Sequence, residues 1–488
     1  MVRVRRGYPR APRVSHPSDS RPSSGASSRA WLATAAFLVA FGLALRIVAA
    51  RGEPWLDEMW SWGLAQKAAT AAGVFALAHD NNHPLNTLWM LAVGDTSTWI
   101  AYRVPALLAG GLTLVLAAAI PWRRSRVEAV LALVLAATSF LLVTYQSEAR
   151  GYAGALLAAF TGWWAIGRWF DDRRPRWVAL YAASSIVGVL SHLTWAHAFG
   201  GLLAWSAWRI AREPAPWIER ARRCALLHAL PFAALTLYWI LYARAMVIGG
   251  GPERPLADVL ASTVCFALGA PDERGVALAI AVVIAALLVL DVVHETRTGH
   301  ANWVLTLGAV VVAPALSIAV FQPDFVAPRY FLVAIAFLYA ALARRAAAAF
   351  EHGGAQRWIA ASLVAAVVFG NLARVVPFLR EGRGHAFEML AYAQSRTRAD
   401  VVTLGGVRDY DLRLMVAFFE PHLAPKPRIA LVTPDAREAP EWLVEPSVEV
   451  HPSPRMRVRE RGVEYALERT FPYFGQSGMH CFLYRRVE

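Results

Sequence analysis

Long apolar runs separated by short polar segments dominate the pattern of this chain. Several runs reach the roughly 20 residues that a helix needs to cross the hydrocarbon core of a membrane. The run at 84–94 has only about 11 residues, so we expect a short helix that lies in the membrane interface. The pattern therefore predicts an all-α polytopic membrane protein with about eleven spanning helices, at 31–50, 101–120, 127–145, 152–170, 177–191, 197–211, 222–243, 276–293, 301–320, 329–346 and 357–377.

The pattern changes after about residue 380. Short apolar strings with a period of two alternate there with polar connectors, and one stretch at 386–397 has helical periodicity. This mixture indicates a small α/β domain, with strands expected near 401–404, 428–432, 463–467 and 481–484. We predict three parts: a disordered basic cytosolic tail at 1–30, a transmembrane domain at 31–379 and a C-terminal α/β domain at 380–488.

Arginine clusters occupy short loops between alternate apolar runs, at 123–126, 173–176, 220–223, 297 and 344–345. Loops rich in Lys and Arg stay on the cytoplasmic side of a membrane. Placing these loops inside puts the N-terminus in the cytoplasm and the C-terminal domain in the periplasm. We therefore predict a multi-pass protein of the bacterial inner membrane, with interfacial helices in the first periplasmic loop.

Composition supports the membrane class. The chain is 57% hydrophobic and 17% charged, whereas soluble domains carry about 25% charged residues. A net charge of +14 would suggest nucleic acid in a soluble protein, but here the arginines determine topology, so we predict no nucleic-acid partner. The three cysteines cannot form a disulfide framework.

Five polar clusters fall on the predicted periplasmic side, at the ends of apolar runs. Ionisable groups at membrane depth are costly, so by default they indicate function or pairing. The alternative interpretation is that they are ordinary loop residues and structural ion pairs, for example between Glu148 and Arg329. The clusters are Asp57-Glu58, Asn81 to Pro84, Gln146 to Tyr152, Ser191 to His197 and Pro328 to Tyr330.

This set of side chains suits group transfer from a lipid phosphate. A carboxylate can act as a general base, arginine binds phosphate in a bidentate manner, and aromatic rings can stack on a sugar. We find no nucleotide-binding fingerprint. A divalent cation held by Asp57, Glu58, His83 or His192 stays an open alternative, because no spacing here is diagnostic of a metal site and we assign no metal ligand or required cofactor.

Four motifs in this order resemble the C-type glycosyltransferase superfamily. They are Trp55-Leu56-Asp57-Glu58, His83-Pro84-Leu85, Ser147 to Tyr152 and Ala327 to Phe331. The resemblance covers about residues 31–346 and is closest to the branch of protein O-mannosyltransferases and the lipid A aminoarabinose transferase. Leu85 and Gly151 stand where many relatives have proline, and neither departure removes a chemical group.

The resemblance implies an inverting transfer from a polyprenyl-phosphate-linked sugar to a hydroxyl or phosphate of a cell-envelope lipid, glycan or protein. It also implies that the acid pair carries the catalytic base, which we assign to Asp57, with Glu58 as second candidate. Candidate donor-phosphate residues are Arg150, Arg329, Tyr330, His83 and Arg103. Candidate substrate-binding residues are Glu148, Tyr152, His192, His197 and Trp55.

Two other classes of function remain. A transporter or flippase for a lipid-linked saccharide would also need polar groups on this face. It should, however, carry charges near the midplane and some repeat symmetry, and we find no repeat. A binding or assembly subunit is the third class, and the acid pair in the first loop argues weakly against it.

Overall fold

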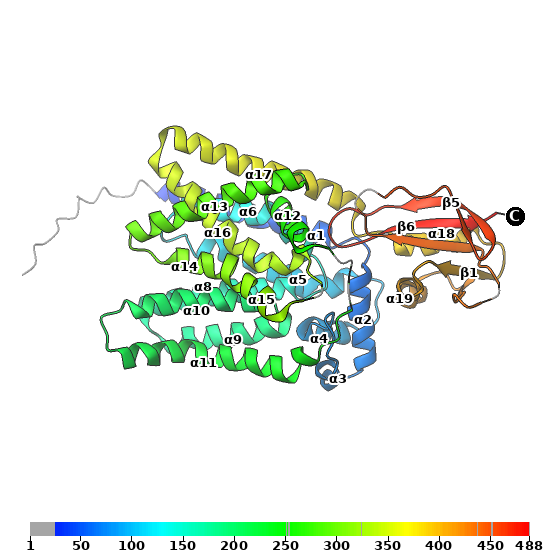
Figure 1. Ribbon diagram of the computed structural model, residues 1–488, viewed down its shortest axis with the longest axis horizontal. Helices are drawn as coiled ribbons and strands as arrows, with labels where there is room; N and C mark the ends of the chain where they lie inside the picture. Colours follow the sequence, from blue (N-terminus) through cyan, green and yellow to red (C-terminus); the bar gives the residue numbers. More distant parts are fainter. Residues whose placement is uncertain are drawn as a thin grey trace, which may run out of the picture.

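The computed structural model describes residues 25–249, 251, 254–323, 325–436, 438–449 and 452–487. Within this part of the chain, seven helices are long and apolar enough to cross a membrane. Figure 1 shows them side by side in one bundle, with a β-sheet beyond one end. The predicted fold class, a polytopic helical protein with a small C-terminal α/β region, is confirmed.

The bounds of the helices follow the predicted apolar runs closely. The seven helices of spanning length comprise α1 (Gly25–Ala49), α5 (Ile100–Ala119), α11 (Trp217–Leu241), α13 (Arg274–Arg297), the series α14 (Asn302–Leu307), η2 (Gly308–Val312) and α15 (Ala313–Phe321), the pair η3 (Pro328–Phe331) and α16 (Leu332–His352), and α17 (Gly354–Glu381). The remaining predicted runs form α6 (Arg126–Thr138), α7 (Phe140–Tyr145), α8 (Tyr152–Asp172), α9 (Pro175–Ser191) and α10 (Trp195–Ala211). The number of spans, about eleven, stays a prediction.

The described helices depart from the predicted pattern at two places. Ser139 divides the run predicted at 127–145 into α6 and α7, and its Oγ accepts a hydrogen bond from the amide of Leu142 at 3.3 Å. Asn371 of α17 accepts a second bond from the amide of Phe140, at 2.8 Å. These side chains satisfy amides that the break would leave without partners. A short helix, α12 (Leu256–Leu268), lies where the sequence predicted none.

The arginine loops meet at one end of the bundle, which we call the arginine-loop end. Arg123 pairs with Asp171 at 3.6 Å, and Ser125 bonds to Glu351 at 3.2 Å. Arg173 pairs with Glu213. The opposite end, which we call the sheet end, carries the β-sheet (Figure 1). Grouping all these loops at one end is what the alternation of basic loops predicts, whereas the side of the membrane that each end faces stays a prediction.

Three short helices of the first long loop cover the sheet end. They are α2 (Leu56–Ala68), α3 (Ala71–Ala76) and α4 (Pro84–Val93). Helix α4 coincides with the short interfacial helix predicted at 84–94, and Pro84 stands in its first turn, where a missing amide proton costs nothing. Figure 1 shows α2 lying across the ends of the long helices.

The C-terminal region forms a six-stranded sheet in the order β2-β1-β3-β6-β5-β4. Strand β1 pairs in parallel with β2 and β3, and the other pairs are antiparallel. The prediction missed β3, β4 and α19. The elements are α18 (Ala386–Arg396), β1 (Val401–Gly406), α19 (Asp409–Phe419), η4 (Glu420–His422), β2 (Arg428–Leu431), β3 (Trp442–Ser447), β4 (Arg457–Glu460), β5 (Val463–Phe471) and β6 (His480–Arg486).

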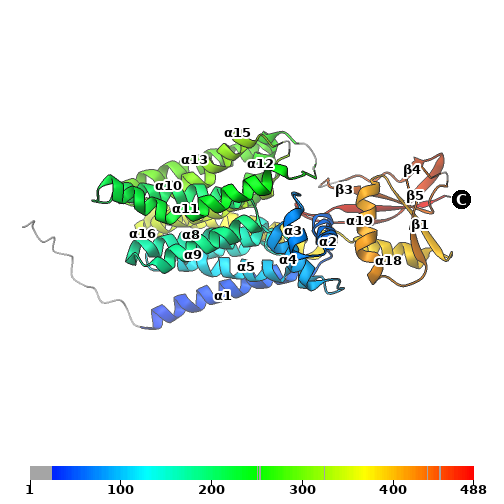
Figure 2. The ribbon, with the colours of Figure 1, turned by 90° about the horizontal axis from the view of Figure 1, so that it is seen from below.

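The sheet region and the first loop share one apolar core. Met59 of α2, Met90 of α4 and Tyr102 of α5 are buried in the same cluster as Met389 of α18 and Phe418 of α19. Figure 2 shows α2 and α4 between the bundle and the helices α18 and α19. The predicted domain boundary between residues 379 and 380 stays a proposal, because apolar packing is continuous across it. Residues 1–24 of the predicted tail lie outside the described residues. Residues 25–30, which the prediction also gave to the tail, form the start of α1.

Candidate active site

Asp57 lies in the first turn of α2, at the sheet end of the bundle. Its Oδ2 is 2.5 Å from Nη1 of Arg150 and 3.6 Å from Nη2 of Arg329. Arg150 comes from the loop between α7 and α8, and Arg329 from η3. Three side chains from distant parts of the sequence, predicted as a base and two phosphate ligands, therefore meet at one point.

Arg150 and Arg329 retain unused hydrogen-bond donors. Nη2 of Arg150 donates to Oδ1 of Asn81 at 2.7 Å. The Nε atoms of both arginines are buried, and neither has a partner within the described part of the chain. The two side chains are 4% and 15% exposed, and Asp57 balances only one of their charges. A buried, unbalanced positive charge is costly, so this arrangement favours an anionic ligand.

Glu58, adjacent to Asp57, has a different environment. It is 2% exposed, and its carboxylate accepts two bonds from Arg103, at 2.7 and 2.5 Å. The amides of Ala149 and Trp55 donate two more, at 2.7 and 3.2 Å. Burial acts to raise the pKa of Glu58, but the Arg103 charge and hydrogen bonds overcome it and lower that pKa. All the acceptor directions of this carboxylate are thus used by the protein, which favours a structural role over the predicted second-base role.

The contacts of Arg103 favour a structural role over the predicted role of donor-phosphate ligand. Besides its two bonds to Glu58, Nη1 donates to the carbonyls of Ala50 and Gly52 at 2.9 and 2.6 Å. Nη2 donates to the carbonyl of Glu53 at 3.0 Å. Its five N–H groups are therefore engaged, and none is left for a phosphate. The residue clamps the loop between α1 and α2 against α5.

A stack of rings borders Arg150. The rings of Tyr152 and His192 are 4.2 Å apart, and those of His83 and His192 are 4.8 Å apart. Burial, with the neighbouring arginine charges, lowers the pKa of both histidines well below the usual value. Nε2 of His83 and the hydroxyl of Tyr152 are buried without a partner among the described residues. These rings therefore offer neutral hydrogen-bonding groups beside the arginines.

The remaining predicted residues lie around this centre. The rings of Trp55 and Tyr330 flank Arg329, with centroids 6.0 and 5.6 Å from its Cζ. His197 is a buried residue of α10 and lies close enough to His192 to influence its pKa. These three side chains therefore lie at the border of the candidate site.

Glu148 pairs with a residue that the sequence analysis missed. Its Oε1 accepts from Nε of Arg383 at 3.3 Å, in place of the Arg329 pairing weighed as an alternative. Burial raises the pKa of Glu148, and the Arg383 charge acts against that rise. The only signal of Arg383 in the sequence is its position between two glycines just after the last apolar run, which is too weak to identify a buried residue.

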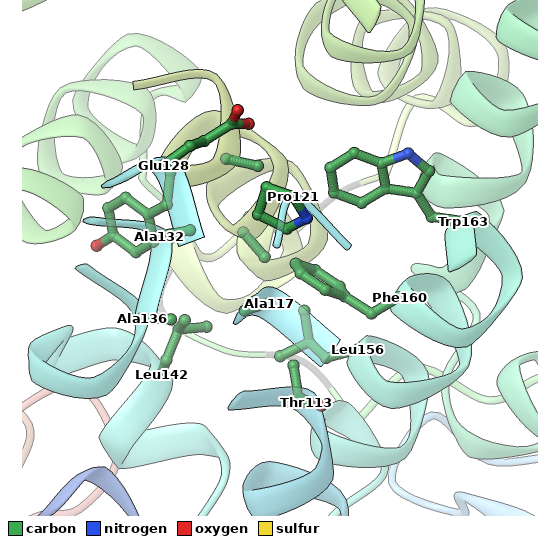
Figure 3. A pocket seen from close by; sticks show the side chains of 13 residues that line it. Thr113, Ala117, Pro121, Glu128, Ala132, Ala136, Leu142, Leu156, Phe160 and Trp163 are labelled. Atoms are coloured by element: carbon green, nitrogen blue, oxygen red, sulfur yellow. The ribbon is translucent and has the colours of Figure 1, made fainter. Parts of the chain in front are cut away.

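One hollow among the described helices lies away from this centre. Figure 3 shows it between apolar side chains such as Leu156, Phe160 and Trp163. It encloses about 470 Å³, part of which is open to the outside. Its single carboxylate, Glu128, is paired with Arg124. None of the predicted site residues lines this hollow, so it contributes no chemistry to the candidate site.

The residues present do not fit a divalent cation. No three His, Cys, Asp or Glu side chains come together as metal ligands in the part of the chain that is described. Asp57 contacts two guanidinium groups, and Glu58 is saturated with donors. Positive neighbours disfavour a cation at either carboxylate.

No protein-family model matches the chain, and no curated protein matches it. Among solved structures, it is similar to apo ArnT from Cupriavidus metallidurans, with 11% identity and a TM-score of 0.49, over 86% of this chain and 93% of that one. It is also similar to the Archaeoglobus fulgidus oligosaccharyltransferase in complex with zinc and sulfate. That match has 12% identity and a TM-score of 0.44, over 81% of this chain and 62% of that one. With both TM-scores below 0.5, these likenesses carry no weight for the reaction of this chain.

Proposed function

We propose that the chain is a membrane glycosyltransferase of the C-type superfamily. It moves a sugar from a polyprenyl-phosphate donor to a hydroxyl or phosphate of a cell-envelope lipid, glycan or protein. The reaction takes place at the sheet end, on the periplasmic side of the inner membrane, and inverts the anomeric centre.

The observation that carries this proposal is the position of Asp57 between Arg150 and Arg329. A carboxylate lies beside two arginines that keep unused N–H groups and an excess of positive charge. The unpartnered Nε2 of His83 and hydroxyl of Tyr152 lie in the adjoining ring stack. A donor phosphate would supply negative charge and hydrogen-bond acceptors to this group.

Asp57 acts as the general base. It takes the proton of the acceptor hydroxyl while that oxygen forms a bond to the anomeric carbon. The bond from this carbon to the phosphate oxygen breaks at the same time, and its electron pair leaves on the lipid phosphate. Arg150 and Arg329 stabilise the additional negative charge on that leaving group. A single displacement of this kind accounts for the proposed inversion.

The ion pair between Asp57 and Arg150 suggests an order of binding. At 2.5 Å, Arg150 holds Oδ2 of Asp57, one of the two oxygens that can accept the proton. A phosphate that competes for Arg150 frees this oxygen to accept the proton. We therefore expect the donor to bind before the acceptor can react.

The test is transfer of labelled sugar from a panel of polyprenyl-phosphate sugars to extracted cell-envelope material. Asp57→Asn should lose about 10²–10⁴ in turnover, the usual contribution of a general base, while still binding polyprenyl phosphate. Asp435→Asn removes an exposed carboxylate of the sheet region and is the matched control. Normal turnover in Asp57→Asn would exclude Asp57 as the base. Binding of lipid phosphate without transfer of any sugar by the wild type would favour the transporter.

A further inference from the structure

Arg383 is a buried arginine that no predicted cluster contains. It lies between α17 and α18, and its side chain is 1% exposed. The guanidinium group donates to four oxygens. They are the carbonyl of Ala49 at 2.9 Å, the carbonyl of Thr144 at 2.7 Å, Oγ of Ser147 at 2.9 Å and Oε1 of Glu148 at 3.3 Å.

These acceptors belong to the two segments that carry the proposed chemistry. Ala49 ends α1 and leads into the loop before Asp57. Thr144, Ser147 and Glu148 lead directly to Arg150. One guanidinium group thus ties together the segment that holds the proposed base and the segment that holds the proposed phosphate ligand. The N–H groups of the planar guanidinium group have a fixed geometry, so Arg383 fixes the relative position of the two segments better than the ammonium group of a lysine could.

A second buried pair adjoins this one. Glu58, bonded to Arg103, also accepts from the amide of Ala149, the residue after Glu148. Two arginines and two glutamates therefore lie together behind Asp57 and Arg150, each at most 2% exposed. Their charges balance, so loss of any one of them leaves a buried charge uncompensated.

The sheet region holds the backbone of Arg383. The carbonyl of Arg383 accepts from the amide of Met479 at 3.3 Å, and the carbonyl of Gly382 accepts from Phe474 at 3.1 Å. Gly384 has a φ of +124°, and a Cβ there would lie 2.8 Å from the carbonyl oxygen of Met479. A side chain at this position would therefore strain the turn that points Arg383 into the bundle.

We propose that Arg383 is a positioning residue for the transfer reaction, and that the sheet region is thereby a working part of the active site. This inference rests on the proposed function. The residue contacts neither donor nor acceptor. It sets the spacing between Asp57 and Arg150, so changes in the C-terminal segment reach the reaction through it.

The test compares Arg383→Met with the double variant Arg383→Met/Glu148→Gln, in detergent-purified full-length protein. Thermal midpoint and kcat at saturating donor are measured with the sugar and acceptor on which the wild type is active. The single variant should lose stability and at least about tenfold in kcat, since small misplacements of reacting groups are costly. The double variant removes both buried charges. We expect it to recover most of the thermal midpoint but not the kcat.

Arg380→Met, an exposed arginine near the end of α17, is the control and should match the wild type. Arg383→Lys keeps the positive charge but loses the geometry of the guanidinium group. Its kcat should lie between that of the wild type and that of the double variant. Wild-type kcat in the stable double variant would overturn the positioning role while leaving the proposed function intact. Absence of transfer by the wild type itself would overturn the proposed function, and this inference with it.

Discussion

At the scale of the residue, two adjacent carboxylates have been given opposite surroundings. Asp57 is 13% exposed and faces two arginines that are not saturated. Glu58 is 2% exposed, and its pKa is lowered by a full set of donors around it. A helix places neighbouring residues about 100° apart around its axis, so adjacent side chains point to different faces. One of the pair therefore faces the two arginines of the proposed site, while the other fastens α2 in place.

Glu58→Gln should reduce stability much more than Asp57→Asn does. Removing one member of a buried ion pair typically costs about 3–5 kcal/mol, because the partner charge stays buried. The measurement is the midpoint of thermal or denaturant unfolding in detergent. Glu58→Gln/Arg103→Met removes both charges and should recover part of the loss. A Glu58→Gln protein as stable as the wild type but inactive would instead make Glu58 the base.

Arg329→Gln should weaken binding of polyprenyl phosphate by about 10–100-fold. A hydrogen bond to a charged group contributes about 1.5–3 kcal/mol, and about 1.4 kcal/mol corresponds to a factor of ten. Binding of polyprenyl phosphate to purified protein gives the Kd directly. Arg244→Gln, which removes an exposed charge just after α11, is the matched control. An unchanged Kd in Arg329→Gln would remove this residue from the phosphate site.

At the scale of the element, the first loop caps a helix of the sheet region. The carboxylate of Glu53 accepts from the amides of Phe387 and Glu388, at 2.7 and 3.2 Å, in the first turn of α18. Burial raises the pKa of Glu53 to about 7, the two amides act against the rise, and the charge of Glu388 adds to it. Arg469 and His385 pair with Glu388 on the same helix end. This contact fastens the sheet region beside the proposed site.

The stability of the folded protein should fall as the pH rises through the titration of Glu53, because ionisation places a charge on a buried carboxyl group. The carboxyl of Glu53 holds its proton up to about pH 7 in the folded protein, against a usual pKa of 4.5. The folded state therefore binds more protons between these values, so stability falls as the pH rises through this range and levels off above about 7. Thermal midpoints from pH 5 to 8.5 measure this slope.

The contribution of Glu53 to the pH dependence of the thermal midpoint can be isolated with two variants. Glu53→Gln resembles the protonated side chain, so it should keep the contact with α18. The fall of the thermal midpoint that comes from ionisation of Glu53 should be absent in this variant. Glu420→Gln, an exposed glutamate of the sheet region, should keep the wild-type slope. Equal slopes in the wild type and Glu53→Gln would show that Glu53 does not titrate in this range.

Elements could be predicted from sequence where periodicity alone decides them. The apolar runs, the short helix α4 and the helix α18 lie within a few residues of the predicted bounds. Helix α12 and strand β3 were missed, since short apolar segments of this length fit several structures. At the site, clusters in the loops predicted Asp57, Arg150 and Arg329, and the structure places these three side chains together. The saturation of Arg103 and the burial of Arg383 depend on contacts between distant segments, which no local pattern records.

At the scale of the whole molecule, charge is distributed between the two ends of the bundle. The arginine loops pair with Asp and Glu side chains at one end, while the candidate site and the sheet lie at the other. An end rich in arginine is expected on the cytoplasmic side. The proposed site then faces the periplasm, where nucleotide sugars are scarce and a lipid-linked donor is needed.

This orientation can be measured with single cysteines and a membrane-impermeant thiol reagent. His300→Cys is an exposed position in the loop between α13 and α14, at the arginine-loop end, and Asp435→Cys is exposed in the sheet region. The wild type is the blank, because Cys265 and Cys481 are buried and Cys224 is partly so. In right-side-out membrane vesicles, Cys at 435 should react at once and Cys at 300 only after lysis, with the reverse in inverted vesicles. The opposite pattern would place the candidate site in the cytoplasm and remove the reason for a polyprenyl-phosphate donor, because soluble nucleotide sugars would then be available to it.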